Sequence, residues 1–171
     1  KEGVTQLYCL GDLVGYYCMF NEVVHTIREN GIRTLMGNHD YALVKNNGVI
    51  ERSKTCTRIL GRQLTEISPE NLAWLQTLET SFSFTQAGTR FFCVHGGLQD
   101  PVDEYIRTID KSYFETNNFT ADVLISGHTH LPRNEEYPPY RYLNPGSVGQ
   151  PRDGNPAASY LLLEEGRGYH K

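Results

Sequence analysis

The chain has 171 residues and a formal net charge of −4. That length suits one domain with a core of its own, and we expect a single domain over residues 1–171. The sequence shows no block of lysine and arginine, and no apolar run close to the roughly 20 residues of a membrane span. A nucleic-acid surface and a membrane partner are therefore not expected.

Cysteine usage favours a reducing compartment, and hence the cytoplasm. The four cysteines form no CxxC pair, and Cys9 and Cys93 stand in the apolar runs "LYCL" and "FFCV". A cysteine in such a run usually acts as a small buried hydrophobe. This fits a reduced protein better than a disulfide scaffold, and it argues against a zinc site built from cysteine.

The first half of the chain alternates predicted strands and helices. Asn30-Gly31 and Pro69 punctuate this half, because the first pair stops a helix and the proline suits a first helical position. Ser68, directly before Pro69, can cap that helix. We expect strands in "QLYCLGD" and "RTLMGNHD", and helices in "NEVVHTIREN", "HDYALVKNN", residues 52–65 and "SPENLAWLQTL".

The second half is richer in predicted strands. Helices are expected only at residues 103–108 and 112–118, and "PRNEEYPPY" is expected to be the most mobile loop. Strands are expected within "SFSFT", "TRFFCVHGG", "ADVLISGHTH", "YRYLNPGS" and "ASYLLLE". Strands and helices that alternate early, with strands dominating late, indicate an α/β sandwich with the sheet inside and helices outside.

Metal-binding residue types follow directly after four of the predicted strands. In open α/β sheets, ligands bind just beyond the carboxyl ends of the strands, so we expect these residues to meet in one crevice. Four of the six histidines belong to this set, and only His25 and His170 do not. The set is Asp12, Asn38, His39, Asp40, His95, His128 and His130.

The donor types in this set indicate the kind of metal. Imidazole, carboxylate and amide oxygen without thiolate suit Mn, Fe, Zn or Co better than a structural zinc. Two metals about 3.5–4 Å apart, bridged by a carboxylate and a water, make hydroxide available at neutral pH and hold a phosphoryl oxygen. Asp12 is the natural bridging carboxylate. We expect two divalent ions, with manganese first and Fe, Zn, Co or Ni as alternatives.

The motifs GDxxG, GNHD, VHGG and GHTH, in this order, resemble those of the calcineurin-like metallophosphoesterase superfamily. The stretches "GDLVGYYCMFNEVVHTIRENGIRTLMGNHD" and "LNPGSVGQPRDGNPAASYLLLE" are similar to its small prokaryotic phosphodiesterase branch, grouped with diadenosine-tetraphosphatase-like proteins. The resemblance covers essentially the whole chain. It implies a four-layer α/β/β/α sandwich with mixed central sheets and a metal site at the carboxyl ends of the strands.

The resemblance also implies an activity and a ligand set. The substrate would be a small phosphodiester, attacked in line by metal-bound hydroxide. Asp12 would bridge both metals, and His130 would bind the first. Asn38, His95 and His128 would complete the second.

Two further residues would act on the substrate without binding metal. The resemblance implies that His39 protonates the leaving oxygen and that Asp40 orients it by a hydrogen bond. A carboxylate beside an imidazole fixes its tautomer and raises its basicity, which supports this pairing independently. Arg152 is a candidate for substrate phosphate, because arginine makes bidentate phosphate contacts; it can equally pair with a nearby carboxylate.

One family motif is not found in this sequence. The family's first motif, Asp-x-His in a "SDxHGN"-like turn, supplies two ligands to the first metal, and nothing upstream of "GDLVG" matches it. A strand, that turn and a helix need roughly 25–35 residues. We expect this N-terminal part to lie outside the sequence given. A protein that truly begins at Lys1 would keep only Asp12 and His130 on the first metal, and its activity should collapse.

Other interpretations remain open at this point. Asp12 can be a turn residue or a helix cap, and His95 can be a buried strand-end histidine. Tyr16 and Tyr17 can line a pocket for an aromatic or nucleobase group, or simply pack; the family often reads "YGPxP" where this chain has "YYCMF". Functional rivals are a dinucleoside polyphosphate or protein phosphatase, and a non-catalytic scaffold of the same fold.

Overall fold

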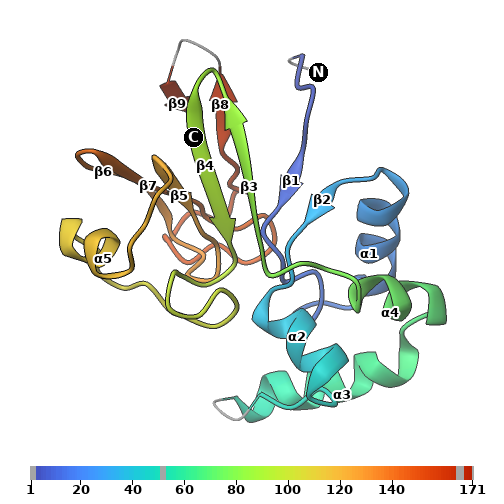
Figure 1. The fold of residues 1–171 in the computed structure, drawn as a ribbon. Helices are drawn as coiled ribbons and strands as arrows, with labels where there is room; N and C mark the ends of the chain where they lie inside the picture. The colour runs from blue at the N-terminus through green and yellow to red at the C-terminus, as the bar shows by residue number, and fades with distance from the viewer. Residues whose placement is uncertain (1–2, 51–52, 165–167, 171) are drawn as a thin grey trace. The chain divides into compact units, whose positions relative to one another are not determined.

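The computed structural model describes residues 3–50, 53–164 and 168–170 (Figure 1). The chain divides into two compact units, residues 1–80 and residues 81–171. Each unit has a hydrophobic cluster of its own. The single domain expected from the sequence stays a prediction.

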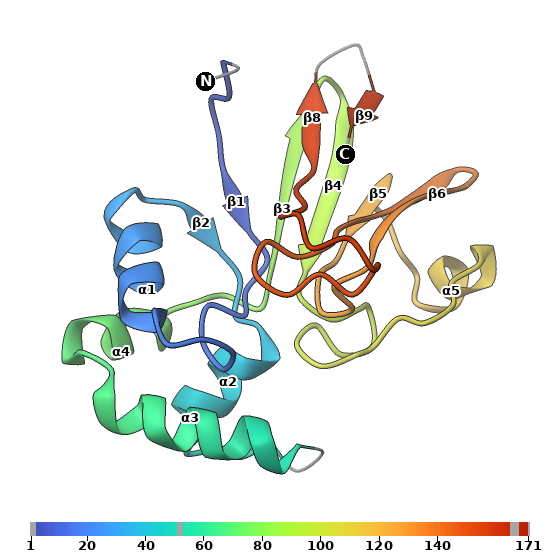
Figure 2. The same cartoon turned by 180° about the vertical axis from the view of Figure 1, so that it is seen from behind.

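The first unit combines a short parallel sheet with helices. Its described elements are β1 (Tyr8–Cys9), α1 (Phe20–Glu29), β2 (Arg33–Thr34), α2 (Asn38–Lys45), α3 (Lys54–Glu66) and α4 (Pro69–Leu75). Figures 1 and 2 both show α1 beside β2. Because β1 and β2 are parallel, with Tyr8 opposite Arg33, the turns that follow them lie at the same edge of the sheet.

The core of this unit ties the loop after β1 to the helices. Val24, Leu43, Leu60 and Leu75 come from α1, α2, α3 and α4 in turn, and all four are almost completely buried. Val14, from the loop after β1, belongs to the same cluster. Burial of large apolar side chains is the main favourable term in folding, so the position of this loop is coupled to the helix packing.

The helix ends follow the predicted signals. The Ser68 hydroxyl accepts a hydrogen bond of 3.2 Å from the N–H of Asn71, and α4 opens at Pro69. The end of α1 precedes Gly31, which adopts a φ of +60°. The helix predicted over residues 52–65 is observed as α3; residue 52 lies outside the described residues.

The second unit contains, within its described residues, a five-stranded mixed sheet of order β3-β4-β5-β7-β6, whose strands are labelled in Figure 1. The three inner strands are parallel, and the two edge strands run antiparallel to their neighbours. Its elements are β3 (Ser81–Gln86), β4 (Thr89–Val94), α5 (Lys111–Thr116), β5 (Val123–Ile125), β6 (Pro132–Tyr137), β7 (Tyr140–Pro145), β8 (Leu162–Glu164) and β9 (Gly168–His170).

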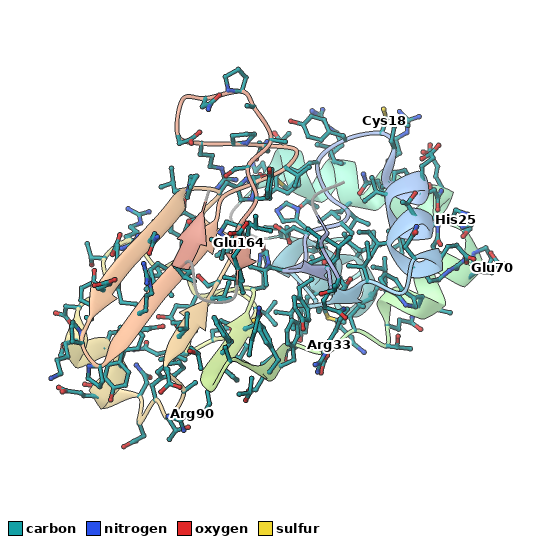
Figure 3. The ribbon with its side chains drawn as sticks, turned by 90° about the horizontal axis from the view of Figure 1, so that it is seen from above. Cys18, His25, Arg33, Glu70, Arg90 and Glu164 are labelled. Atoms are coloured by element: carbon teal, nitrogen blue, oxygen red, sulfur yellow. The ribbon has the colours of Figure 1, made fainter. Side chains whose placement is uncertain are left out.

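Aromatic packing joins α5 to this sheet. Phe114 of α5 is fully buried and shares a cluster with Leu124 of β5 and Tyr142 of β7. Its ring stacks on that of Tyr140, with centroids 4.8 Å apart. In contrast, Arg90 lies at the outer margin of the sheet (Figure 3). The mixed α/β class is confirmed, whereas the four-layer α/β/β/α packing stays a prediction.

Residues 103–108 are not helical, so that prediction is wrong. The chain turns at residues 101–103 instead. Asp100 Oδ1 accepts hydrogen bonds from the N–H of Val102 at 2.9 Å and of Asp103 at 3.0 Å. A short aspartate side chain that takes up backbone donors in this way offers the chain an alternative to a helix.

Residues 132–137 form strand β6, so the prediction of a mobile loop is wrong there. The strand pairs with β7 from Pro132–Pro145 to Tyr137–Tyr140. It lies at the edge of the sheet. Edge strands commonly carry charged residues and proline, which discourage pairing with other chains, and this composition resembles that of a loop.

The part of the chain that the structure describes contains no helix with both the length and the apolar character needed to cross a bilayer.

Arg133 and Glu135 of β6 form an ion pair that makes stability depend on pH. Arg133 Nε lies 2.6 Å from Glu135 Oε1, and Arg133 Nη2 lies 2.8 Å from Oε2. The guanidinium also lies over the Tyr142 ring, 4.8 Å from its centroid. The hydrogen bonds from Arg133 are the main cause that lowers the pKa of Glu135. A carboxylate with a lowered folded-state pKa stabilises the fold above its unfolded pKa, and this contribution is lost as pH falls through the folded pKa.

We therefore expect the wild type to be more stable than Glu135→Gln at neutral pH. The difference should begin to shrink as pH falls below the unfolded glutamate pKa of about 4.3, and it should be lost as pH passes through the lower folded pKa. Urea unfolding of both proteins across this pH range measures it. Glu136→Gln is the matched control on the same strand, because its ion pair with Arg141 is more exposed and contributes less. A difference between wild type and Glu135→Gln that stays constant with pH would contradict the expectation.

Candidate functional site

In the first unit, Asp12 is fixed at the N-terminus of α2. Its Oδ1 accepts a hydrogen bond of 3.0 Å from the N–H of His39, the second residue of the helix. Asn38, which precedes His39 and is the first residue of α2, is also buried. The N-terminus of a helix favours negative charge. Asp12 Oδ1 thus caps the start of α2, which is the alternative to metal binding that the sequence left open.

Asp40 of α2 is fully buried and binds the backbone of the loop that carries Asp12. Its carboxylate accepts four backbone hydrogen bonds. The donors are the N–H groups of Asp12 at 2.7 Å, Leu13 at 2.9 Å, Val14 at 3.3 Å and Gly37 at 2.9 Å. A buried carboxylate is stable only with such partners, so Asp40 determines the course of the loop after β1. No motif in the sequence indicated this role.

The glycines of the GD and GN turns allow the two turns to touch. Gly11 has a φ of +98°, and a Cβ there would come within 2.7 Å of Gly37 Cα. A Cβ on Gly37 would overlap the carboxylate of Asp12. A larger residue at either position would push the turns apart and move Asp12 relative to α2.

His39 is enclosed by the same loop, and only 5% of it is exposed. Tyr16 stacks on its imidazole, with centroids 4.3 Å apart and 29° between the planes. Gly15, at a φ of +93°, lies so close that a Cβ would overlap His39 Nδ1. Tyr16 therefore packs on His39, which is one of the two alternatives for the tyrosine pair. The orientation of His39 by Asp40 stays a prediction.

In the second unit, His95 and His128 lie side by side after β4 and β5. The N–H of Gly127 donates to the carbonyl of His95 at 3.0 Å, which joins the two turns. The imidazole centroids are 5.1 Å apart, and one ring nitrogen of each lies within 4.8 Å of the other. Metal–nitrogen bonds are about 2 Å long, so two imidazoles this close fit a shared divalent ion.

Asp103 and Tyr105 flank His128, and sequence reasoning missed both. Asp103 Oδ1 lies 3.6 Å from His128 Nε2, and the Tyr105 ring meets the imidazole edge-on, with centroids 5.2 Å apart. Tyr105 also donates its hydroxyl to the carbonyl of Thr129 at 3.3 Å. Both residues lie in the segment that was wrongly expected to be helical, so no motif pointed to them.

His130 is oriented by the backbone of a later loop. Its Nδ1 lies 2.7 Å from the carbonyl oxygen of Gln150. A carbonyl can only accept, so Nδ1 carries the proton and the lone pair of the neutral ring is on Nε2. This is the arrangement that orients metal-binding histidines. Arg152 adjoins it: its N–H donates to the carbonyl of His130 at 3.1 Å, and its exposed guanidinium donates to Gln150 Oε1 at 3.2 Å.

Three of the predicted ligands have a left-handed backbone conformation. Asp12, His128 and His130 each have a φ of +60°. For a residue other than glycine this conformation costs on the order of 1–3 kcal/mol and is concentrated at functional sites. The protein thus bears backbone strain at three positions where the sequence predicts metal binding, which favours a functional interpretation over a simple turn.

The burial of Cys9 fits a metal site without a thiolate ligand. Burial raises the pKa of the Cys9 thiol to about 11, and the negative charges of Asp40 and Asp12 act in the same direction. Because the thiolate is the form that binds metal, Cys9 is a poor ligand at neutral pH. His25 lies exposed on the outer side of α1 (Figure 3), as expected for a non-ligand. The side chain of His170 lies outside the described residues.

Carboxylate and imidazole ligands placed after successive strands of a mixed α/β fold are typical of a metal-dependent hydrolase. The chain belongs to the calcineurin-like phosphoesterase superfamily: residues 1–168 match the family described as "Calcineurin-like phosphoesterase superfamily domain". The resemblance seen in the four motifs is thereby confirmed. Members of this family are metal-dependent phosphoric ester hydrolases that use divalent ions.

Individual relatives agree with this assignment. The protein MJ0912 of Methanocaldococcus jannaschii is 30% identical over 180 residues, which cover 96% of this chain and 73% of that protein. "Phosphodiesterase YfcE" of Escherichia coli is 40% identical over 75 residues, which cover 44% of this chain and 34% of that protein. A crystal structure of a metallophosphoesterase from Sphaerobacter thermophilus aligns with a TM-score of 0.76 and 27% identity, over 95% of this chain and 74% of that one.

The two aspartates should respond differently to the same substitution. Asp40→Asn places an amide N–H₂ among four backbone donors, and we expect it to lower the free energy of unfolding by about 3 kcal/mol or more, because hydrogen bonds to charged groups contribute about 1.5–3 kcal/mol each. Asp12→Asn keeps an oxygen for the N–H of His39, and asparagine tolerates the left-handed conformation. Its loss should stay below about 1 kcal/mol. Urea unfolding of both variants measures this, and equal losses would contradict the assigned roles.

Proposed function

We propose that the protein is a dinuclear-metal phosphodiesterase that hydrolyses a small phosphodiester. The orientation of His130 is the observation that carries this proposal. Its protonated Nδ1 is bound to a backbone carbonyl, and the lone pair is therefore on the nitrogen that a divalent ion needs. The left-handed backbone at Asp12, His128 and His130 supports the same conclusion.

The proposed ligands follow the family pattern. Asp12 would bind both ions, and His130 would hold the first. Asn38, His95 and His128 would hold the second. This donor set, imidazole with carboxylate and amide oxygen, favours manganese, with Fe, Zn, Co or Ni as alternatives. When bound, two such ions supply an activated hydroxide and neutralise charge on the phosphate.

The other residues act on the substrate. His39 holds a proton for the leaving oxygen, since the alkoxide released from a diester is a poor leaving group without a general acid. Asp40 holds the loop that encloses His39. Arg152 binds the phosphate: its backbone N–H donates a hydrogen bond to the carbonyl of His130, and its guanidinium is exposed.

Similarity to a phosphodiesterase favours diesters over other phosphate esters. The stretch shared with YfcE is 40% identical, although it covers 44% of this chain. Dinucleoside polyphosphates and phosphoproteins are the alternative substrates, and relative turnover on the three classes separates them. From its cysteine usage we place the enzyme in the cytoplasm. From its charge pattern and the lack of a long apolar run, we propose no nucleic-acid or membrane partner.

Replacement of His39 should depend on the leaving group. In His39→Ala we expect turnover of an alkyl phosphodiester to fall by about 10²- to 10⁴-fold, as for the loss of a general acid. A nitrophenyl diester should lose far less, because its leaving phenolate needs no proton. Steady-state kinetics on both substrates measures this, with His25→Ala as the control and metal content checked in each. Equal losses on the two substrates would refute the role of His39.

Metal content tests the dinuclear site itself. Elemental mass spectrometry after saturation with Mn²⁺ should find about two ions per chain, and the count should fall in His128→Ala. Activity restored to the metal-free protein by Mn²⁺, Fe²⁺, Zn²⁺, Co²⁺ and Ni²⁺ ranks the metals. One ion or none per chain in the wild type would overturn the dinuclear proposal.

A further inference from the structure

The loop after β1 is held at both of its ends by buried polar side chains. Asp40 holds its first part, as described above. Its second part is held by Gln63 of α3, which is only 3% exposed. Gln63 Oε1 accepts a hydrogen bond from the N–H of Gly15 at 2.7 Å, and Gln63 Nε2 donates to the carbonyl of Tyr17 at 2.8 Å.

A carboxamide is the side chain that this position requires. The backbone presents one donor, at Gly15, and one acceptor, at Tyr17, and an amide matches both at once. A leucine or methionine at position 63 would leave both backbone groups without this partner. Because a buried polar group without a partner costs about 1–3 kcal/mol, an apolar residue in this core position would be unfavourable.

The residues between these two bonds are those that touch His39. Gly15 lies against the imidazole so closely that no Cβ fits, and Tyr16 stacks on the ring. The backbone on either side of Tyr16 is fixed by the same side chain. A change in the Gln63 bonds therefore moves both surfaces that define the orientation of His39.

We propose that Gln63 is a positioning residue that sets the orientation of the His39 imidazole through Gly15 and Tyr16. It does not touch the substrate. The kinetic consequence rests on the proposed function, in which His39 protonates the leaving oxygen. The geometric consequence, a displaced His39 ring, does not depend on the reaction.

Matched variants separate positioning from general stability. Gln63→Met keeps the length of the side chain and removes both hydrogen bonds. Gln63→Glu keeps the acceptor for the N–H of Gly15. Asn71→Leu is the control: Asn71 is equally buried in the same unit, but its amide donates to Asn21 of α1, at 3.0 Å to both the carbonyl and Oδ1.

The first readout is the NMR signal of the His39 ring, in protein labelled at histidine and loaded with Zn²⁺, which is diamagnetic. The signal is assigned by its disappearance in His39→Ala. We expect the ring-current shift caused by Tyr16 to shrink in Gln63→Met, to shrink less in Gln63→Glu and to stay unchanged in Asn71→Leu. A Gln63→Met spectrum with the wild-type His39 shift would overturn the proposal.

The second readout is kinetic. Gln63→Met should lower turnover of the alkyl diester by about 10- to 100-fold, as expected for a misplaced catalytic group, and affect the nitrophenyl diester less. Added to His39→Ala, it should cause no further loss on the alkyl diester; a full additional loss would overturn the proposal. If His39→Ala itself shows no preference for leaving group, the proposed function fails at His39, and the NMR comparison still decides the role of Gln63.

Discussion

The carboxylate of Asp40 is the group on which the site in the first unit depends. It is fully buried, and its four backbone hydrogen bonds come from two separate turns. A buried charge must be matched by donors or it destabilises the fold. The loop after β1 satisfies this carboxylate by lying against the start of α2, which places Asp12 at the helix N-terminus. Glycines at positions 11 and 37 make that approach sterically possible.

Within each unit, backbone groups hold the candidate site side chains. Asp12 accepts from the N–H of His39, and His130 donates to the carbonyl of Gln150. His95 and His128 are joined through the bond between Gly127 and the carbonyl of His95. Backbone atoms of packed elements move less than exposed side chains, so a site supported in this way is held close to one geometry. Such preorganisation is what catalysis by positioning requires.

This geometry has a cost in stability. The left-handed conformations at Asp12, His128 and His130 are unfavourable for residues other than glycine. Glycine at these positions would relieve the strain and remove the ligand. Strained backbone at functional residues is the usual form of the trade-off between stability and activity. The buried aspartate and glutamine that hold the loop after β1 are the compensating interactions in the first unit.

The sequence by itself indicated the candidate metal ligands, because turns after buried strands and donor types that suit a divalent metal are local features. It also determined most helices, through caps such as Ser68 and the apolar spacing that buries Leu60 and Leu75. Two predictions from local composition were wrong. The charged strand β6 was expected to be a loop, and a helix was expected at residues 103–108, where Asp100 stabilises a turn instead. Only the tertiary structure decided what Asp40 and Gln63 do. Three of the four donors to Asp40 lie 26–28 residues away in the chain, and both partners of Gln63 lie 46–48 residues away. A polar side chain shows no periodicity when its hydrogen bonds go to a distant backbone, so its role becomes visible only once the loop and the helices are packed.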